Sequence, residues 1–212
     1  MYYFDIHTHS ISLFSEKECV SFDINRELPH SDVLYVSVGI HPWTLTCENA
    51  ERSFLQLYDL TKDNKVIAIG EVGLDKLRGP SLDVQISVLR KVIELAEDKR
   101  LPLVIHCVRA FRELLALKKE FRPIQPWIIH GFRGKRTVAH ELIKHGFYLS
   151  VGSQFQEQAL LEIPLNRLFI ETDDSYESIE EVYIRIAASR NISLEELTEA
   201  VKLNVQKVFF KH

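Results

Sequence analysis

Cysteine, glycine and proline are all scarce in this sequence, with three, eight and seven residues among 212. The cysteines are odd in number and show no C-x-x-C spacing, which argues against a disulfide framework or a cysteine zinc knuckle. So little glycine and proline excludes collagen-like and low-complexity disordered chains. An excess of basic charge is also missing, because 26 Lys and Arg stand against 30 Asp and Glu, a formal net charge of -4. We therefore expect any contact with a polyanion to be local, not a general coating of nucleic acid.

Long hydrophobic runs are absent as well, since no stretch approaches about 18 uninterrupted apolar residues. The opening MYYFDIHTHS lacks the basic and apolar segments of a secretion signal. These absences predict a cytoplasmic protein without a membrane segment. The length predicts one domain over residues 1–212, near the lower limit of about 200 residues for a (β/α)8 barrel.

Short apolar runs recur along the chain, and several are continuous and rich in β-branched residues. Such runs are typical of strands in a parallel sheet that is covered on both faces. Eight strands are predicted, at 2–6, 18–24, 33–38, 66–70, 102–106, 126–130, 147–151 and 167–171.

Helical patterns lie between the later strands. Apolar residues repeat at helical spacing over 84–95 and 179–186, and a capping box at Ser193 and Glu196 predicts a last helix that runs toward Phe210. Strands that alternate with helices predict βα units, and eight of them predict a closed TIM-type (β/α)8 barrel.

The first third of the chain breaks this alternation. Only about nine residues separate the first strand from the second, and about eight separate the second from the third. A complete crossover with its helix needs at least about 10–12 residues. We therefore predict a distorted barrel that lacks the first one or two crossover helices. The alternative is an irregular arm over 10–32 beside a sheet of seven strands.

The missing helices would leave apolar strand faces uncovered on this N-terminal flank. The loop at Leu13 and Phe14 and the C-terminal helix cannot cover both strands, and a large exposed patch marks an interface. This predicts a homodimer packed through the flank, whose apolar residues are Val20, Phe22, Ile24, Leu34, Val36 and Val38.

Chemistry-bearing residues begin at the end of the first strand. Asp5, His7 and His9 alternate along it, so they share one face, which in a barrel is the interior. Two imidazoles two residues apart on a strand can chelate one divalent metal ion. The alternative is a pair of incidental histidines.

Four more such residues lie within two positions of a predicted strand end, where barrel enzymes place their catalytic groups. Singly, each could fill the core or cap a helix. Together with His7 and His9, they would be uncompensated polar groups if they were buried without metal. These four residues are Glu71, His106, His130 and Asp173.

The sequence resembles the TatD family of metal-dependent hydrolases, which belongs to the amidohydrolase superfamily of barrels. The resemblance covers 1–10 and about 35–210. It is carried by DIHTH, GIHPW, GEVGLD, PLVIH, HGFRG, GFYLSVG and ETDDSY, in this order.

The resemblance implies a pair of divalent metal ions, Zn²⁺, Mn²⁺ or Mg²⁺, bridged by one carboxylate, and hydrolysis of a phosphoester such as DNA. The implied ligands are His7, His9 and Asp173 on the first ion, His106 and His130 on the second, and Glu71 on both. Asp173, near the attacking water, can act as the general base.

Further side chains are candidates for substrate contacts. His41 in GIHPW would contact a substrate oxygen or protonate the leaving group. Positive charge near a helix start attracts phosphate, which singles out Arg109, Arg133, Lys135 and Arg136. Their alternative is a solvated basic turn.

Two departures from the family pattern concern substrate contacts. The usual H-S-R-D-A is HCVRA here, so the arginine, Arg109, stands one position later and the aspartate is absent. The usual proline is missing from ETDDSY.

Three alternatives stay open. DIHTHS would also open a PHP-type phosphoesterase, although that interpretation leaves GIHPW, GEVGLD and ETDD unexplained. The superfamily also hydrolyses amides and lactones. From another class, a non-catalytic barrel could keep metal for folding and bind a partner.

Overall fold

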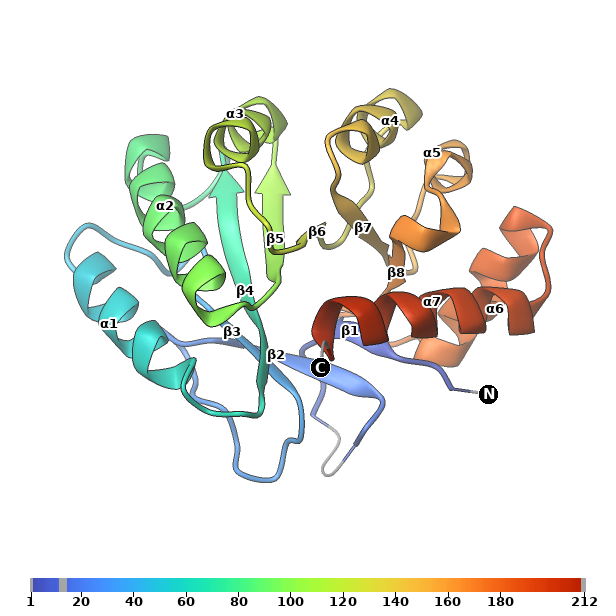
Figure 1. Ribbon diagram of the computed structural model, residues 1–212, viewed down its shortest axis with the longest axis horizontal. Coiled ribbons are helices and arrows are strands. Elements are labelled where there is room, and N and C mark those ends of the chain that lie inside the picture. The colour runs from blue at the N-terminus through green and yellow to red at the C-terminus, as the bar shows by residue number, and fades with distance from the viewer. Residues whose placement is uncertain (1, 12–14, 211–212) are drawn as a thin grey trace.

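A computed structural model describes residues 2–11 and 15–210. Its strands form one parallel sheet in chain order (Figure 1). The eight strands are β1 (Asp5–Thr8), β2 (Glu18–Asp23), β3 (Val36–Gly39), β4 (Val66–Asp75), β5 (Leu103–Val108), β6 (Trp127–Ile129), β7 (Tyr148–Val151) and β8 (Leu168–Ile170). All eight predicted strands are therefore present, and β2 pairs with both β1 and β3, so the seven-strand alternative is wrong.

Helices cover the outside of the sheet from β3 onward (Figure 1). They bury an apolar stripe against the strands, as Val88, Val92 and Ile93 of the second helix do. The helices are α1 (Ala50–Leu60), α2 (Leu82–Lys99), α3 (Phe111–Phe121), α4 (Arg136–Lys144), α5 (Glu157–Glu162), α6 (Ile179–Arg190) and α7 (Leu194–Phe209), with the 3-10 turn η1 (Leu165–Arg167).

The predicted helices are confirmed within α2, α6 and α7. Ser193 caps α7 by accepting a hydrogen bond from the Glu196 amide at 3.0 Å. A full capping box, which the sequence analysis missed, starts α6 at Ser178 and Glu181.

The first two crossovers contain no helix among their described residues, 9–11 and 15–17 between β1 and β2 and 24–35 between β2 and β3. Between β2 and β3 a loop takes the place of a helix (Figure 1). The predicted distorted TIM-type barrel is therefore confirmed.

The barrel closes only at the rim that carries the C-terminal ends of the strands. There Thr8 forms a single parallel bridge with Asp173, just beyond β8. The Asp173 amide donates to the His7 carbonyl at 2.9 Å, and the His9 amide donates to the Asp173 carbonyl at 3.3 Å. These two backbone hydrogen bonds hold three predicted site residues together.

The flank that was expected to be bare is covered within one chain. Five of its six apolar side chains are buried and Leu34 is half-buried. The Phe22 ring lies 6.0 Å from that of His30 in the β2–β3 loop, and the Tyr35 ring 4.9 Å from that of Phe210 after α7. The premise of the predicted homodimer is therefore wrong, because the loop folds back over its own strand. Leu13 and Phe14 lie outside the described residues.

None of the helices in the part of the chain that the structure describes has the length and apolar character needed to cross a membrane.

A buried tyrosine of α6 holds the start of β1. The Tyr183 hydroxyl donates to the Phe4 carbonyl at 3.0 Å and accepts from the Phe4 amide at 3.3 Å. Tyr183→Phe leaves both backbone groups unpaired, so we expect the free energy of unfolding in urea to fall by about 1–3 kcal/mol. The control is Tyr176→Phe, since Tyr176 is fully exposed. If the two variants unfold at the same urea concentration, Tyr183 does not stabilise the start of β1.

Candidate metal centre

Glu71 lies in the middle of β4 and is buried at the centre of the site. Its strand was predicted to end at 70 but continues to Asp75. Gly73 explains how the neighbouring strand approaches: it pairs with His106, and a Cβ there would lie 1.9 Å from the His106 carbonyl oxygen. Its φ of +151° also favours glycine. This glycine therefore lets β5 bring His106 against Glu71.

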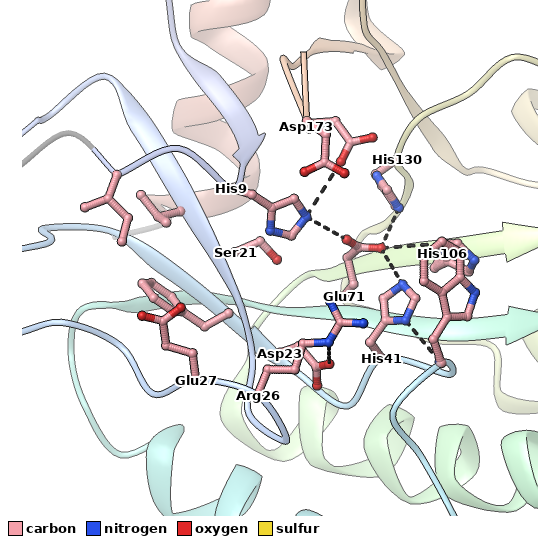
Figure 2. A pocket seen from close by; sticks show the side chains of 15 residues that line it. His9, Ser21, Asp23, Arg26, Glu27, His41, Glu71, His106, His130 and Asp173 are labelled. Atoms are coloured by element: carbon pink, nitrogen blue, oxygen red, sulfur yellow. Dashed lines mark hydrogen bonds and ion pairs between the residues drawn. The ribbon is translucent and has the colours of Figure 1, made fainter. Parts of the chain in front are cut away.

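The two carboxylate oxygens of Glu71 face different sets of side chains. Oε1 lies 3.1 Å from His7 Nε2 and 3.2 Å from His9 Nε2. Asp173 Oδ1 lies 3.7 Å from both imidazole nitrogens. Figure 2 shows His9 and Asp173 on one side of Glu71. These four residues could hold one metal ion.

Three other histidines face Oε2 of Glu71 (Figure 2). His130 Nε2 lies 2.8 Å away, His41 Nε2 3.2 Å and His106 Nδ1 3.4 Å. The structure thus brings the other five predicted ligands and His41 around the carboxylate of Glu71.

Two further carboxylates lie beside the outer nitrogens of His106 and His130. Asp75 Oδ2 lies 3.1 Å from His106 Nε2, and Glu171 Oε1 lies 3.5 Å from His130 Nδ1. The hydrogen bond between Asp75 and His106 fixes the His106 tautomer and leaves its inner lone pair free for a metal ion. Glu171 approaches His130 as a charge and forms no hydrogen bond with it. The sequence analysis missed both. The available signal was the period of two, since Asp75 follows Glu71 on one face of β4 and Glu171 precedes Asp173 by two positions.

Asp5 plays a different part. Its carboxylate accepts from the His7 amide at 3.1 Å, the Thr172 amide at 3.2 Å and the Thr172 hydroxyl at 2.6 Å. It therefore ties β1 to the chain after β8 and does not orient an imidazole. Burial raises the pKa of Asp5 to about 8, against the hydrogen bonds from Thr172 and His7.

His41 differs from His106 in its tautomer. Its Nδ1 accepts a hydrogen bond from the Trp43 amide at 3.1 Å, so a neutral His41 carries its proton on Nε2. That nitrogen faces Glu71 and the pocket. His41 is therefore placed to donate a hydrogen bond to an oxygen atom, whereas His106 offers a lone pair.

Opposite charges dominate the centre. Burial alone would raise the pKa of Glu71, but His130, His106 and His41 outweigh it and hold this pKa well below its ordinary value. Burial alone would lower the pKa of His130, but Glu71 and Glu171 outweigh it and raise this pKa well above the ordinary value. The ionised form of Glu71 is therefore stable only while positive charge lies beside it, from protonated imidazoles or from bound cations.

The residues present fit divalent metal ions. Their donors are imidazole nitrogens and carboxylate oxygens, a set that suits Zn²⁺, Mn²⁺ or Fe and suits Mg²⁺ less well. Of the nine buried side-chain atoms that lack a hydrogen-bond partner among the described residues, three belong to His7, His130 and Glu171 at this centre, which indicates polar groups that the protein alone does not satisfy. These three atoms are His7 Nδ1, His130 Nδ1 and Glu171 Oε2.

The centre opens into two pockets that share Asp173 and Asp174. The first, of 350 Å³, extends over β2 and includes Ser21, Asp23 and Arg26 (Figure 2). The second, of 580 Å³, extends along the loops after β6, β7 and β8 and is lined by Arg133, Ser153, Gln154, Tyr176 and Arg185 among others. A ligand at the centre therefore has room on both sides.

Of the four basic residues predicted to contact the substrate, one lines a pocket at the centre. Arg133 lines the second pocket, with Nη2 3.9 Å from Asp173 Oδ2. Arg136 instead pairs with Glu162 at 2.8 Å, and neither Lys135 nor Arg109 lines either pocket. Arg26, which lines the first pocket, was not predicted from the sequence, and nothing in its local pattern singles it out.

Comparison with known proteins identifies the relatives. The family model of the TatD related DNases matches residues 8–210. The uncharacterized metal-dependent hydrolase YabD of Bacillus subtilis is 33% identical over 184 residues, which span 79% of this chain and 72% of that protein. The human 3'-5' RNA nuclease TATDN2 is 33% identical over 78% of this chain but only 23% of its own length. The 3'-5' ssDNA/RNA exonuclease TatD of Cronobacter sakazakii is 33% identical over 66% of this chain and 57% of its own.

Two solved structures share the fold. YjjV, a TatD homologue from Escherichia coli, superimposes with a TM-score of 0.77 at 22% identity, covering 92% of this chain and 86% of its own. A TatD family hydrolase from Entamoeba histolytica gives 0.77 at 20% identity, covering 99% and 98%.

The outer carboxylates can be tested through metal affinity. Asp75→Asn should weaken metal binding about 10–100-fold in a competition with a chromogenic chelator, because His106 loses the carboxylate that fixes its tautomer. The matched control is Asp83→Asn, an exposed change in the first turn of α2. If the two variants bind metal equally well, Asp75 does not support the centre.

Proposed function

Because the chain belongs to the family of TatD related DNases, we propose that it is a metal-dependent hydrolase that cleaves phosphodiester bonds, with nucleic acid as its substrate class. The observation that carries the proposal is the division of the Glu71 carboxylate. One oxygen faces the imidazoles of β1, and the other faces those from the ends of β3, β5 and β6. A carboxylate held in this way is suited to bridge two divalent ions.

Two sets of ligands follow from this division. Those of the first ion would be His7, His9 and Asp173, those of the second His106 and His130, with Glu71 shared. Two ions supply Lewis acidity toward a phosphoryl oxygen and lower the pKa of a water molecule.

Asp173 is proposed as the general base. It is half-buried beside both pockets, and burial raises its pKa from the ordinary value while the charge of His7 opposes the rise. A carboxylate within hydrogen-bond reach of the attacking water can accept its proton. Asp173 can do so at the junction of the pockets, where a substrate would cross.

His41 and Arg133 are proposed to contact the substrate. His41 offers its Nε2 proton toward the first pocket, which suits hydrogen bonding to a phosphoryl or leaving oxygen. Arg133 offers a guanidinium in the second pocket, where a flanking phosphate of a polynucleotide would lie. Arg109, Lys135 and Arg136 are left out of the proposed contacts because they line neither pocket.

The substrate class rests on the relatives and on the shape of the site. The names of the human and Cronobacter relatives give RNA, or single-stranded DNA and RNA, as what those proteins act on. Pockets on both sides of Asp173 suit a strand with groups on both sides of the scissile phosphorus. The family match over 8–210 favours this function over a PHP-type phosphoesterase. The cytoplasmic location stays a prediction.

An activity panel separates the remaining alternatives. Oligonucleotides, a small phosphodiester, an amide and a lactone would be assayed with the metal-loaded protein and with the chelated protein. Metal-dependent turnover of the phosphodiesters supports the proposal. Turnover of the amide or lactone alone would favour another superfamily chemistry, and no turnover with metal retained would favour the non-catalytic barrel.

Asp173→Asn tests the mechanism. Without the proton acceptor, kcat on an oligonucleotide should fall about 10²–10⁴-fold, while the ion held by His106 and His130 stays bound. The control is Asp98→Asn, an exposed change on α2. Activity within a few-fold of wild type between about pH 6 and pH 9, the range in which a tuned general base works, would remove Asp173 from the mechanism.

Arg133→Gln tests the second pocket. The loss of one phosphate contact made in the ground state should raise KM more than it lowers kcat. It should also reduce the slope of log(kcat/KM) against log[salt] by about 0.7 for a single strand. Lys135→Gln removes the same charge two residues away, outside both pockets, and should change neither quantity. Equal effects of the two variants would return Arg133 to a solvated surface role.

A further inference from the structure

A third pocket lies at the opposite pole of the barrel. Its lining comes from segments that precede the last parallel strands: 123–126 before β6, Gly146 before β7 and Arg167 before β8. The C-terminal parts of α3 and α7 complete it with Lys118 and Lys207. Its volume is 200 Å³. Because the metal centre lies at the other ends of these strands, the two sites are separate.

The lining of this polar pocket carries positive charge and no carboxylate. Its three cations are Lys118, Arg167 and Lys207, and none of them forms an ion pair with a described acidic residue. Glu97, whose charge acts on Lys118, uses its two oxygens to accept from the backbone amides of residues 124 and 125, at 3.1 and 2.9 Å. The local charge is therefore not balanced within the pocket.

Aromatic rings hold two of these cations in place. The Lys118 ammonium lies 4.8 Å from the Trp127 ring and 4.6 Å from the Phe147 ring. The Arg167 guanidinium lies 4.6 Å from the Tyr148 ring, which belongs to the pocket wall. Burial, and next the charge of Arg167, lower the pKa of Lys118 to about 8. Lys118 and Arg167 are thus held in place and repel each other, which a bound anion would relieve.

A polar side chain in the same wall lacks a partner. Gln125 is only 9% exposed, and its side-chain amide forms no hydrogen bond with any described residue. Its amide atoms are not among the fully buried polar atoms that lack a partner, so they open into the pocket that the residue lines, where an acceptor can pair with the two N–H donors. The free donors of Gln125 and the three cations call for a ligand that only accepts hydrogen bonds.

We propose that this polar pocket binds a phosphate group, with Lys118, Arg167 and Lys207 supplying the charge and the Gln125 amide a hydrogen bond. A doubly charged oxyanion matches three cations better than a carboxylate does, and guanidinium and ammonium groups are its usual partners. The phosphate is either the free ion or the terminal group of a nucleotide. The site does not depend on the proposed metal centre.

Calorimetry with inorganic phosphate tests the charge requirement. The Arg167→Gln/Lys207→Gln double variant should bind phosphate at least about tenfold more weakly than wild type, because charge-assisted hydrogen bonds are lost. The matched control is Lys119→Gln/Lys144→Gln, which removes the same charge from exposed positions outside the pockets described above. If phosphate binds at another site, the two double variants should show the same affinity for it. Equal affinities of the two double variants would overturn the proposal.

Nuclear magnetic resonance locates the ligand independently of folding effects in the variants. In uniformly ¹⁵N-labelled wild-type protein, the side-chain NH₂ signals of Gln125 should shift as phosphate is added, with the dissociation constant found by calorimetry. Gln125 signals that stay unmoved at saturating phosphate would overturn the proposal.

A comparison of three probes distinguishes the two sources of the phosphate. Inorganic phosphate, deoxyadenosine 5'-monophosphate and deoxyadenosine are titrated in turn. Equal affinity for the first two supports the free ion, and tighter binding of the mononucleotide supports a nucleotide phosphate. Binding of the nucleoside as tight as that of the mononucleotide would show that phosphate is not recognised and would contradict the site.

Discussion

The buried carboxylate of Glu71 is the constraint on which the rest of the site depends. Five imidazole nitrogens lie 2.8 to 3.4 Å from its two oxygens, in residues that come from four strands or the loops after them. Burial of one charged group is stable only when opposite charge compensates it. The extension of β4 past Glu71 and the close approach of β5 at Gly73 both serve to keep the carboxylate at this depth.

Near-closure of the barrel is what brings the two ends of the chain to Glu71. His7 and His9 come from β1 and its end, Asp173 follows β8, and backbone hydrogen bonds at the rim join these segments. An open sheet would leave them at opposite edges. The buried Tyr183 and Asp5 stabilise the same junction from the α6 side and from within the rim. The shortened first crossovers do not disturb it, because the β2–β3 loop and the end of α7 cover the strands in place of helices.

Patterns of short range were predictable from the sequence. Continuous β-branched runs identified all eight strands, and the short spacing between the first three identified the missing helices. The ligand-type residues at strand ends were found because parallel strands bring their carboxyl ends to one rim. The predictions that were wrong concern features that depend on contacts between residues far apart in the sequence. The true end of β4 follows from pairing with β5, and apolar runs do not show where such pairing stops.

Side-chain direction and surface coverage were also beyond the sequence. Arg133 and Arg136 are three residues apart and look equivalent in the pattern, yet one lines a pocket and the other pairs with Glu162. The cover over Phe22 comes from His30 in a loop without periodicity, so the sequence did not show that this loop and the end of the last helix would cover the flank in place of a second copy. Asp75 and Glu171 were within reach, because each repeats the two-residue period of a strand that already carried a predicted ligand.

The most direct test of the account is the metal content of chelator-free protein, measured by elemental analysis for the wild type and for Glu71→Gln. If Glu71 joins two metal sites, the wild type contains about two divalent ions per chain, as two-metal hydrolases do, and the variant loses both. Two ions retained in Glu71→Gln, or a wild-type content no higher than that of a His7→Ala/His9→Ala double variant, would contradict it.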